Sequence, residues 1–494
     1  MPDSNGMEFA NLFGEDSGMR NSITTNINGR DIVIDDAPPD QMALAWLRAE
    51  GFISVKEGCG EGDCGACTVA LGVPKDGGFE WREVASCLLF LPMLDGRALL
   101  TAEGLRASDG APHPVQQAMA DNFGTQCGYC SPGITMSLFA MSRRGHDGDA
   151  AIFDGLAGNL CRCTGYRPIL DIARTLPALP AEPAEASLAA RLSADTAEAL
   201  SYHADGRSFF APIALADALA YRATHPEAWV LAGGTDLGLT VTKRHQRSPD
   251  ILSLTRVAEL TRIVEEDNAL LVGAAVPYAV ILPAISRRHP ELAKLLRRVG
   301  ASQVRNQGSF GGNLGTASPI GDSLPALIAL GATIEVASSG QRRSVAAEDF
   351  VTGYRKTRLS ADELIVAVRL PDLPAGEIFR TYKVAKRMDQ DISTVSAAFR
   401  LTLENGCVAT FSAAFGGVAD RPLRASRFES ALLGKPWTTA NLAVAQPALN
   451  EDIAPQSDLR GSAEYRRKVA ANLVTRLWHE TTNSVLYPVS LDLV

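Results

Sequence analysis

The sequence contains no apolar run approaching 18 residues, which is about the length that indicates a membrane-spanning helix. It also lacks a block of basic residues, and its formal net charge of −9 argues against a nucleic-acid partner. The first residues show neither a cationic-then-apolar export signal nor a twin arginine, so we expect a cytoplasmic protein. The 7 histidines are scattered without metal-ligand spacing, and we expect them to be surface or core residues.

Cysteine is scarce over most of the chain and concentrated in one part of it. Of the 9 cysteines, only Cys407 lies beyond position 163. The first group of four reads C-x4-C-x2-C followed by a distant fourth cysteine, which is the spacing of plant-type [2Fe–2S] ferredoxins. Two complete sets of four thiolates predict two redox clusters and therefore an electron relay. The groups are Cys59, Cys64, Cys67 and Cys87, and then Cys127, Cys130, Cys161 and Cys163.

Two other uses of cysteine have to be weighed. Disulfide frameworks are typical of short secreted domains, unlike this chain of 494 residues. Structural zinc also uses CxxC pairs. The first group favours iron–sulfur, because glycine stands at positions 58, 60, 62 and 65. Such a loop can wrap tightly and direct backbone N–H groups at sulfur. On its own, the second group is compatible with either metal.

The second group has a different local setting. Each of its two pairs precedes a proline and an apolar stretch, and proline suits the first turn of a helix. Both pairs are therefore predicted at helix N-termini, where free N–H groups and the positive end of the dipole favour an anionic thiolate cluster. The first group instead follows a predicted hairpin over Ile23–Ile34, with Asn28-Gly29 at its turn. The pairs are Cys127 and Cys130, before Pro132, and Cys161 and Cys163, before Pro168.

A chain of this length and 46% hydrophobic content should hold three or four domains. We expect residues 1–21 to be disordered. A first cluster domain is expected over 22–100 and a second over 101–175. Residues 176–204 are predicted to be a linker, because Leu176–Glu185 is rich in proline and alanine. From residue 205 the pattern changes to alternating strands and helices.

Two glycine-rich segments, Gly233–Gly238 and Gly308–Gly315, lie in this second half. Neither is a G-x-G-x-x-G or Walker A motif, and each alone is compatible with a purely structural turn. Both nevertheless allow close approach of the backbone to a phosphate, and Ala228–Ala232 before the first predicts a buried strand. Beside two predicted clusters they favour a dinucleotide. A flavin suits the chemistry, because clusters pass single electrons whereas nicotinamide takes a hydride.

Several motifs together resemble the xanthine oxidase family of molybdenum hydroxylases, and their order resembles the iron–sulfur and FAD subunit of its bacterial members. The resemblance covers about residues 22–480, and the cysteine motifs carry most of its specificity. The matching segments are Lys56–Thr68, Gln126–Gly133, Asn159–Arg167, Ala232–Leu237, Gly311–Asn313, Ala317–Asp322 and Gly353–Thr357.

This resemblance implies a multidomain α+β fold. Its parts would be a β-grasp [2Fe–2S] ferredoxin domain, a four-helix [2Fe–2S] domain, an FAD domain of the vanillyl-alcohol-oxidase type over 205–377, and a C-terminal α+β domain over 378–488. It also implies a partner, a large subunit that carries the molybdenum–pterin centre, assembled with this chain in a heterotetramer. Neither nucleic acid nor membrane is expected as a partner.

The resemblance assigns roles to individual residues. The eight clustered cysteines would hold two [2Fe–2S] clusters, and Gln126 and Cys163 would approach the pterin of the partner. Tyr354 and Arg355 would lie beside the isoalloxazine on the side of NAD⁺. The residues implied for FAD are Val230, Leu231, Ala232, Gly233, Gly234, Thr235, Asp236, Leu237, Val299, Ser309, Phe310, Gly311, Gly312, Asn313, Asp322, Ile365 and Lys383.

Two of these assignments depend strongly on the resemblance. Val299 stands where animal relatives carry an aromatic residue, so flavin packing and NAD⁺ access are expected to differ here. Without the motif context, Lys383 and Arg355 would be interpreted as solvated surface charges.

The resemblance implies a relay that takes electrons from hypoxanthine or xanthine, oxidised to urate in the partner, through both clusters to FAD and then to NAD⁺. One alternative is an electron-transfer subunit for an aldehyde or N-heterocycle hydroxylase. A second, of another class, is a non-catalytic iron–sulfur redox carrier with vestigial flavin loops.

Overall fold

The computed structural model describes residues 19–75, 77–107 and 109–482. The chain divides into two compact units: unit 1 comprises Met1–Ala258 with Ser302–Gln307, and unit 2 comprises Glu259–Ala301 with Gly308–Val494. Most of the segment expected to be disordered, 1–21, lies outside the described residues, as does the end of the expected domain 378–488. At the first described positions, Arg20 forms a parallel bridge with Leu200, and its guanidinium lies 2.5 Å from the carboxylate of Asp95.

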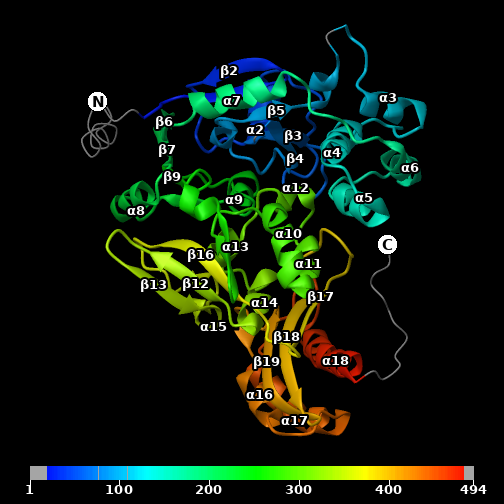
Figure 1. Ribbon diagram of the computed structural model, residues 1–494, viewed down its shortest axis with the longest axis vertical. Helices are drawn as coiled ribbons and strands as arrows, with labels where there is room; N and C mark the ends of the chain where they lie inside the picture. The colour runs from blue at the N-terminus through cyan, green and yellow to red at the C-terminus, as the bar shows by residue number, and fades with distance from the viewer. Residues whose placement is uncertain (1–18, 76, 108, 483–494) are drawn as a thin grey trace. The chain divides into compact units, whose positions relative to one another are not determined.

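Unit 1 begins with the five-stranded sheet expected for a β-grasp domain (Figure 1). The predicted hairpin is confirmed, because Asn28 and Gly29 have φ angles of 52° and 79°, as a type I′ turn requires. Helix α2 (Ala43–Ala49) buries its apolar side chains in the same core. In sheet order the strands are β2 (Arg30–Ile34), β1 (Ile23–Ile27), β5 (Ala98–Leu100), β3 (Thr68–Lys75) and β4 (Gly78–Ala85), and the short 3-10 helices are η1 (Leu91–Leu94) and η2 (Ala102–Leu105).

Four helices follow and pack around their own apolar core. A proline occupies the first turn of three of them, α3, α4 and α6, as the prolines at 132 and 168 predicted for two. The segment expected to be a linker, 176–204, instead contains a further helix, α7 (Glu185–Asp195), and the first strand of the next sheet, from Leu200. Helix α7 lies on the first sheet (Figure 1), and its Leu192 is buried in one cluster with Trp81. The four helices are α3 (Pro114–Asp121), α4 (Ser131–Arg144), α5 (Gly148–Leu156) and α6 (Arg167–Thr175).

Unit 1 closes with a second, four-stranded sheet in the order β6-β7-β9-β8. Strand β8 is the strand predicted over Ala228–Ala232, and it lies parallel to β9. The short helix α12 (Ser302–Arg305) also belongs to unit 1, although the residues on either side of 302–307 belong to unit 2. The other elements are β6 (Leu200–Ala204), β7 (Arg207–Ala211), α8 (Leu215–Thr224), β8 (Trp229–Leu231), α9 (Leu237–Thr242) and β9 (Asp250–Ser253).

Unit 2 starts with an antiparallel sheet in the order β10-β11-β16-β12-β13. Its helices share one apolar core with the sheet, in which α14 is buried at every position. The strands are β10 (Ile263–Glu266), β11 (Ala269–Gly273), β12 (Thr333–Ala337), β13 (Arg342–Ala346) and β16 (Leu364–Pro371); the helices are η3 (Ala258–Thr261), α10 (Tyr278–Arg288), α11 (Pro290–Arg297), α13 (Phe310–Thr316), α14 (Ser323–Leu330) and α15 (Ala347–Phe350); a hairpin joins β14 (Val351–Gly353) and β15 (Lys356–Thr357).

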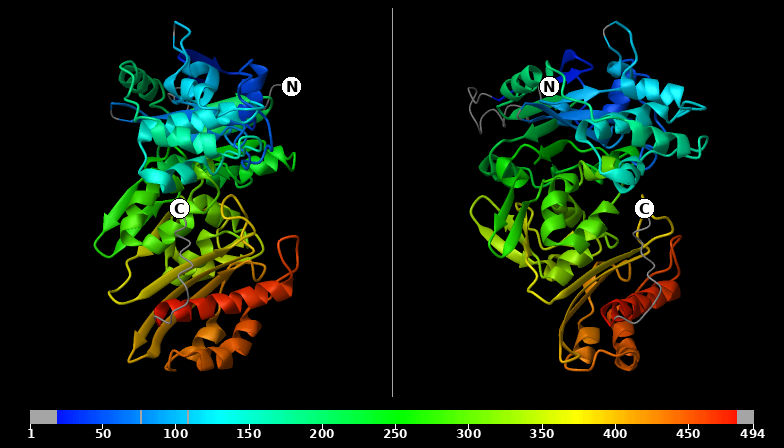
Figure 2. Two further views of the ribbon diagram at one scale, coloured as in Figure 1. Left: turned by 90° about the vertical axis from the view of Figure 1, so that its right-hand side faces the viewer. Right: turned by 45° about the vertical axis from the view of Figure 1, so that its right-hand side comes forward.

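The second sheet of unit 2 is covered on both faces. Alternate residues of β18 point to opposite cores: Phe399 packs with the C-terminal helices, whereas Ala398 joins the core around α14. Helix α18 lies along one face of the sheet (Figure 2). The strands are β17 (Ile378–Val384), β18 (Val395–Glu404), β19 (Cys407–Gly416) and β20 (Leu423–Arg424), and the helices are α16 (Ser426–Leu432), α17 (Thr439–Asp452) and α18 (Ala463–Thr481).

The observed architecture is the predicted multidomain α+β fold. Among the described residues, no helix combines the length and the apolar character that crossing a membrane would require.

The C-terminal core depends on a cluster of aromatic rings around Phe399, which lies 5.5 Å from Phe415 and 5.8 Å from Tyr382 between ring centroids. We expect Phe399→Ala to destabilise this domain by about 3–5 kcal/mol, because the removed ring leaves a cavity in a close-packed core. Chemical denaturation followed by tryptophan fluorescence would measure the loss. Val444→Ala, at a side chain 79% exposed, is the matched surface control; an equal loss there would contradict the prediction.

Candidate functional site

The first cysteine group lies on a loop between α2 and β3, and glycine shapes this loop in two ways. Gly60, Gly62 and Gly65 adopt φ angles of +65°, +82° and +67°, which L-residues with a side chain rarely adopt. Gly58 has an ordinary φ, but a Cβ there would lie 2.6 Å from Sγ of Cys64. The glycines therefore allow both the turn and the close approach of backbone to sulfur that the sequence predicted.

Backbone N–H groups surround the sulfur of Cys59. The N–H groups of Glu61, Asp63 and Cys64 donate to this sulfur at 3.3–3.4 Å, and the N–H of Cys59 donates to Sγ of Cys64 at 3.3 Å. The hydrogen bond from the Cys64 thiol, helped by the backbone donors, lowers the pKa of Cys59 to about 5. The loop thus stabilises a thiolate, the form of cysteine that binds metal.

The four cysteines of this group lie as two pairs. Cys59 is hydrogen-bonded to Cys64, and Cys67 to Cys87, and the charge of Cys59 acts on both members of the second pair. Within the described part of the chain, no three potential ligands converge on a point as they would around a single ion. Paired thiolates fit a [2Fe–2S] centre, in which each of two irons takes two protein ligands.

The second group repeats the pairing at two helix N-termini. Cys130 is the N-cap residue of α4, and Cys161 and Cys163 lie in the turn before α6, as predicted. Side-chain hydrogen bonds pair Cys130 with Cys161 and Cys127 with Cys163. Burial raises the pKa of Cys130 to about 12. Cys127 and Cys163 are exposed, as is Gln126, the residue expected to face the pterin of a partner.

The loops that carry the two groups are in direct contact within unit 1. The N–H of Leu160 donates to the carbonyl of Cys64 at 2.9 Å, and Nδ2 of Asn159 donates to the carbonyl of Gly65 at 3.2 Å. Lys243, which follows α9, donates to the carbonyl of Cys59 at 2.5 Å. Asn159 lies within one of the motifs that carry the family resemblance, but no local pattern assigns a role to it or identifies Lys243.

The first glycine-rich segment, Val230–Leu237, runs from β8 into α9 in unit 1. Gly234 has φ +76°, and a Cβ there would lie 3.3 Å from the carbonyl of Leu88. Leu88 directly follows the cysteine ligand at position 87. Gly234 is therefore required by its backbone conformation and by close packing against the chain that carries the first cluster.

The second glycine-rich segment, Ser309–Asn313, forms the start of α13 in unit 2. Ser309 is the N-cap, and its hydroxyl accepts from the N–H of Gly312 at 3.1 Å. Phe310 is buried edge-on against Tyr278. A Cβ at Gly311 would lie 2.5 Å from the carbonyl of Ala274, so packing alone already requires this glycine.

A buried polar chain follows from Asn313. Its side-chain oxygen accepts from the hydroxyl of Ser323 at 2.6 Å, and the neighbouring Asp322 carboxylate lies 2.7 Å from Nζ of Lys383. Ser393 donates to the other oxygen of Asp322. The Lys383 side chain is only 2% exposed, so it is not the solvated surface charge that its sequence alone would suggest. Ser323 and Ser393, which the resemblance does not assign to the flavin, also belong to this series of polar contacts.

Four further expected residues lie elsewhere in unit 2. Ile365 of β16 is buried, and Val299 is partly buried against the same core. Tyr354 and Arg355 form the two-residue turn between β14 and β15, where the Tyr354 side chain is 61% exposed and Arg355 has φ +52°. The turn presents these side chains to solvent, where a dissociable ligand could reach them.

A buried side-chain amide without hydrogen-bond partners is a further sign that the residues present fit a flavin cofactor. Gln307, two residues before Ser309, is buried, and neither its amide oxygen nor its nitrogen has a hydrogen-bond partner among the described residues. Buried amides normally have hydrogen-bond partners. A polar cofactor bound here would supply the partners that the amide of Gln307 lacks.

Comparison with protein families gives four matches along the chain. They are a 2Fe-2S iron-sulfur cluster binding domain over residues 25–91, a [2Fe-2S] binding domain over 101–174, an FAD binding domain in molybdopterin dehydrogenase over 202–373, and a CO dehydrogenase flavoprotein C-terminal domain over 380–481. The matches follow the order of the domains described above.

Individual relatives agree. Xanthine dehydrogenase of Emericella nidulans is 30% identical over 94% of this chain and 39% of that protein, so the chain spans about two fifths of such relatives. Quinoline 2-oxidoreductase from Pseudomonas putida 86 matches 56% of this chain and 96% of its own, with 32% identity and a TM-score of 0.52. Carbon monoxide dehydrogenase from Hydrogenophaga pseudoflava matches 54% and 94%, with 30% identity and the same TM-score. With paired cysteines, flavin loops and domain order in agreement, the chain belongs to the xanthine oxidase family of molybdenum hydroxylases, as an electron-transfer subunit with [2Fe–2S] and FAD domains.

Proposed function

We propose that the chain is the small subunit of a xanthine dehydrogenase, an NAD-dependent oxidoreductase of purine catabolism. The observation that carries the proposal is the presence of both cluster domains and the FAD domain on one chain, in an order that the xanthine dehydrogenase of Emericella nidulans matches over 94% of the sequence. We place the molybdopterin and the site that oxidises hypoxanthine and xanthine to urate in a large partner subunit, within a heterotetramer.

In this proposal the eight paired cysteines hold two clusters, and the residues of the two glycine-rich segments hold FAD together with Asp322 and Lys383. When bound, the clusters exchange single electrons, and the flavin exchanges electrons singly with them and a hydride with NAD⁺. Tyr354 and Arg355, on the exposed β14–β15 turn, would position the nicotinamide. Cysteines that bind metal rather than form disulfides fit a cytoplasmic location.

A second candidate is an electron-transfer subunit for an N-heterocycle hydroxylase. It is favoured by the quinoline 2-oxidoreductase structure, whose 32% identity is slightly above the 30% of the xanthine dehydrogenase. Assaying the reconstituted complex with xanthine, quinoline and an aldehyde would decide between them. Turnover of quinoline without turnover of xanthine would overturn the first proposal.

The cysteine pairs predict the iron content. The purified chain should carry about four irons, because eight thiolates make two [2Fe–2S] sites. Cys64→Ser or Cys130→Ser should abolish the EPR signal of one reduced cluster and leave the other, since each removes one thiolate from one pair. Cys407→Ser, in the C-terminal sheet, is the matched control and should leave iron unchanged. Stoichiometric zinc in place of iron would contradict the assignment.

The polar chain around Asn313 predicts flavin retention. Asn313→Leu should reduce bound FAD at least about tenfold, because it leaves the hydroxyl of Ser323 without its acceptor and removes a polar contact for the cofactor. Absorbance near 450 nm, normalised to iron, would measure the loss, and iron should remain native. Asn441→Leu, in α17, is the control. Native FAD content in Asn313→Leu would remove Asn313 from the flavin site.

The division of labour between subunits predicts two separable activities. The isolated chain, loaded with FAD and iron, should oxidise NADH with an artificial acceptor, because NAD chemistry requires only the flavin. It should not turn over xanthine until the molybdenum subunit is added. Spectrophotometric assays of both reactions would check this.

The exposed turn supplies an internal control for that experiment. Tyr354→Ala should weaken the NADH reaction several-fold while sparing xanthine oxidation measured with a dye that accepts electrons upstream of FAD. Xanthine turnover by the isolated, molybdenum-free chain would refute the division of labour.

A further inference from the structure

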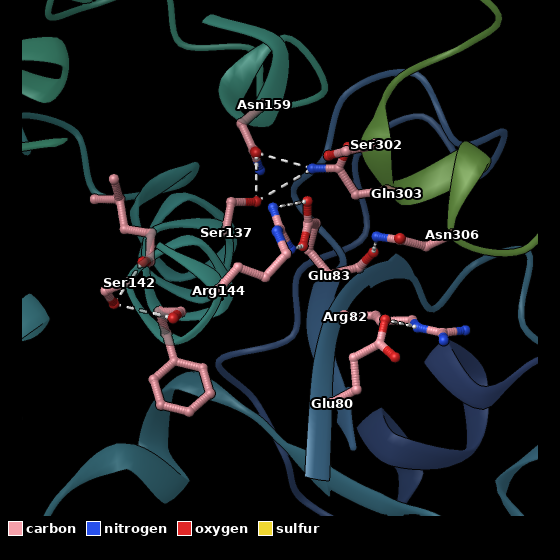
Figure 3. A network of polar contacts seen from close by, with 12 residues as sticks. Glu80, Arg82, Glu83, Ser137, Ser142, Arg144, Asn159, Ser302, Gln303 and Asn306 are labelled. Carbon is pink, nitrogen blue, oxygen red and sulfur yellow. Dashed lines mark hydrogen bonds and ion pairs between the residues drawn. The ribbon is translucent and has the colours of Figure 1, made fainter. Parts of the chain in front are cut away.

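One buried carboxamide in unit 1 makes hydrogen bonds to four different groups. Asn159 is 2% exposed. Its Nδ2 donates to the carbonyl of Gly65 at 3.2 Å and to Oγ1 of Thr68 at 3.3 Å. Its Oδ1 accepts from Oγ of Ser137 at 2.7 Å and from Nε2 of Gln303 at 2.9 Å (Figure 3). The amide is therefore fully used, on both its donor and its acceptor side.

These partners fix which way the amide faces. The carbonyl of Gly65 can only accept, so the NH₂ of Asn159 must face it, and the oxygen must then face Gln303. Gln303, 1% exposed, also donates to Ser137 at 3.2 Å. In a low-dielectric interior each unmade bond of such a network is expensive, so a flipped or displaced amide is strongly disfavoured.

The same amide joins the loops of both cysteine groups. Gly65 lies between Cys64 and Cys67, and Asn159 lies two residues before Cys161. The adjacent N–H of Leu160 donates to the carbonyl of Cys64. There is no room for adjustment between these loops, since a Cβ at Gly65 would lie 2.1 Å from the carbonyl of Gly158.

Helix α12 holds the outer side of this network in place. Next to Gln303, Arg305 lies 2.6 Å from the carboxylate of Asp154 in α5. Asn306 donates to the backbone carbonyl of Glu83 at 2.8 Å, and the side chain of Glu83 accepts two hydrogen bonds from Arg144 of α4 (Figure 3). Gln303 therefore lies on a helix whose neighbouring residues bind both cluster domains.

We propose that Asn159 is a positioning residue that sets the relation between the two iron–sulfur centres, with its amide locked by Gln303 of α12. The inference rests on the proposed function, because it requires that both cysteine groups hold clusters. The four hydrogen bonds of the Asn159 side chain do not include one to a cysteine sulfur. The residue acts through the backbone of Gly65 and of its own loop.

Two measurable consequences follow. The N–H dipole of Asn159 directs its positive end at the first-cluster loop, so its loss should make reduction of that cluster less favourable. The separation and orientation of the loops should also become less fixed, which would alter the magnetic interaction between the two reduced clusters.

The test uses the purified full-length chain and three variants. Asn159→Leu keeps the branched shape but removes both the donor and the acceptor. Gln303→Met removes the hydrogen bond that Gln303 donates to Asn159 and leaves both cysteine loops unchanged in sequence. It therefore still tests the proposal if Asn159→Leu does not fold. Asn26→Leu is the matched control, because it removes a buried amide of unit 1 that donates to Asp31 within the β1–β2 hairpin rather than to a cysteine loop or to α12.

Each protein is poised at one fixed solution potential, and EPR measures the reduced fraction and power saturation of each cluster. In Asn159→Leu we expect the reduced-to-oxidised ratio of the first cluster to fall at least about threefold, equivalent to about 28 mV for a one-electron couple, with altered saturation. Gln303→Met should show a smaller change of the same sign, and Asn26→Leu none.

The possible outcomes distinguish a failure of the proposed function from a failure of the proposed role of Asn159. Wild-type protein without two EPR signals would refute the proposed function. Two native signals that are unchanged in both Asn159→Leu and Gln303→Met, at native iron content, would overturn this inference alone. An equal change in Asn26→Leu would also overturn it, because the effect would then be general destabilisation.

Discussion

The interaction on which unit 1 depends is the hydrogen bond from a backbone N–H to sulfur. A thiolate that binds iron must stay deprotonated while it is partly withdrawn from water. Around Cys59 three N–H groups of one short loop supply that stabilisation, and around the second group the turn before α6 contributes backbone donors to Cys161. The donors exist only because glycines and helix starts leave N–H groups unpaired, so these residues define the sites as much as the cysteines do.

This requirement explains why the two cysteine domains approach backbone to backbone at some points of their contact. Donor-rich loops have little bulk of their own, and at Gly65 and Gly133 an added Cβ would lie 2.1 Å from a backbone carbonyl of the facing loop. Backbone meets backbone there, and polar groups such as the N–H of Leu160 find their partners across the contact. Such a contact fixes geometry more narrowly than one between flexible side chains, which suits centres that exchange electrons.

Features governed by local chemistry could be predicted from the sequence. The Asn28-Gly29 turn, the helix starts at Pro132 and Pro168 and the strand before Gly233 all follow from backbone preferences of a few residues, and all are present. The cysteine spacing indicated the cluster type in the same way. The glycine-rich segments favoured a flavin, and the FAD binding domain match supports it. The roles of single residues toward FAD and NAD⁺ rested on resemblance rather than on local pattern, and they remain proposals.

Features that depend on distant partners could not be predicted in this way. Lys383 is buried because Asp322, 61 positions away, neutralises it. Asn159 gains its role from Gln303, 144 positions away. Helix α7 was hidden by a composition typical of a linker, although Leu188 and Leu192 stand one helical turn apart and pack on the sheet. In each case tertiary contact, not propensity, decides the outcome.

The short excursion of residues 302–307 into unit 1 has a consequence for how the protein is made. Domains generally fold as units during synthesis, the N-terminal ones first. Here the N-terminal unit lacks Gln303, Arg305 and Asn306 until more than forty further residues after Ala258 have been translated. The buried acceptors on Asn159 and Glu83 have no donors from α12 until those residues have been synthesised. The nascent cysteine domains therefore cannot reach their final packing before translation has passed into the sequence of the second unit.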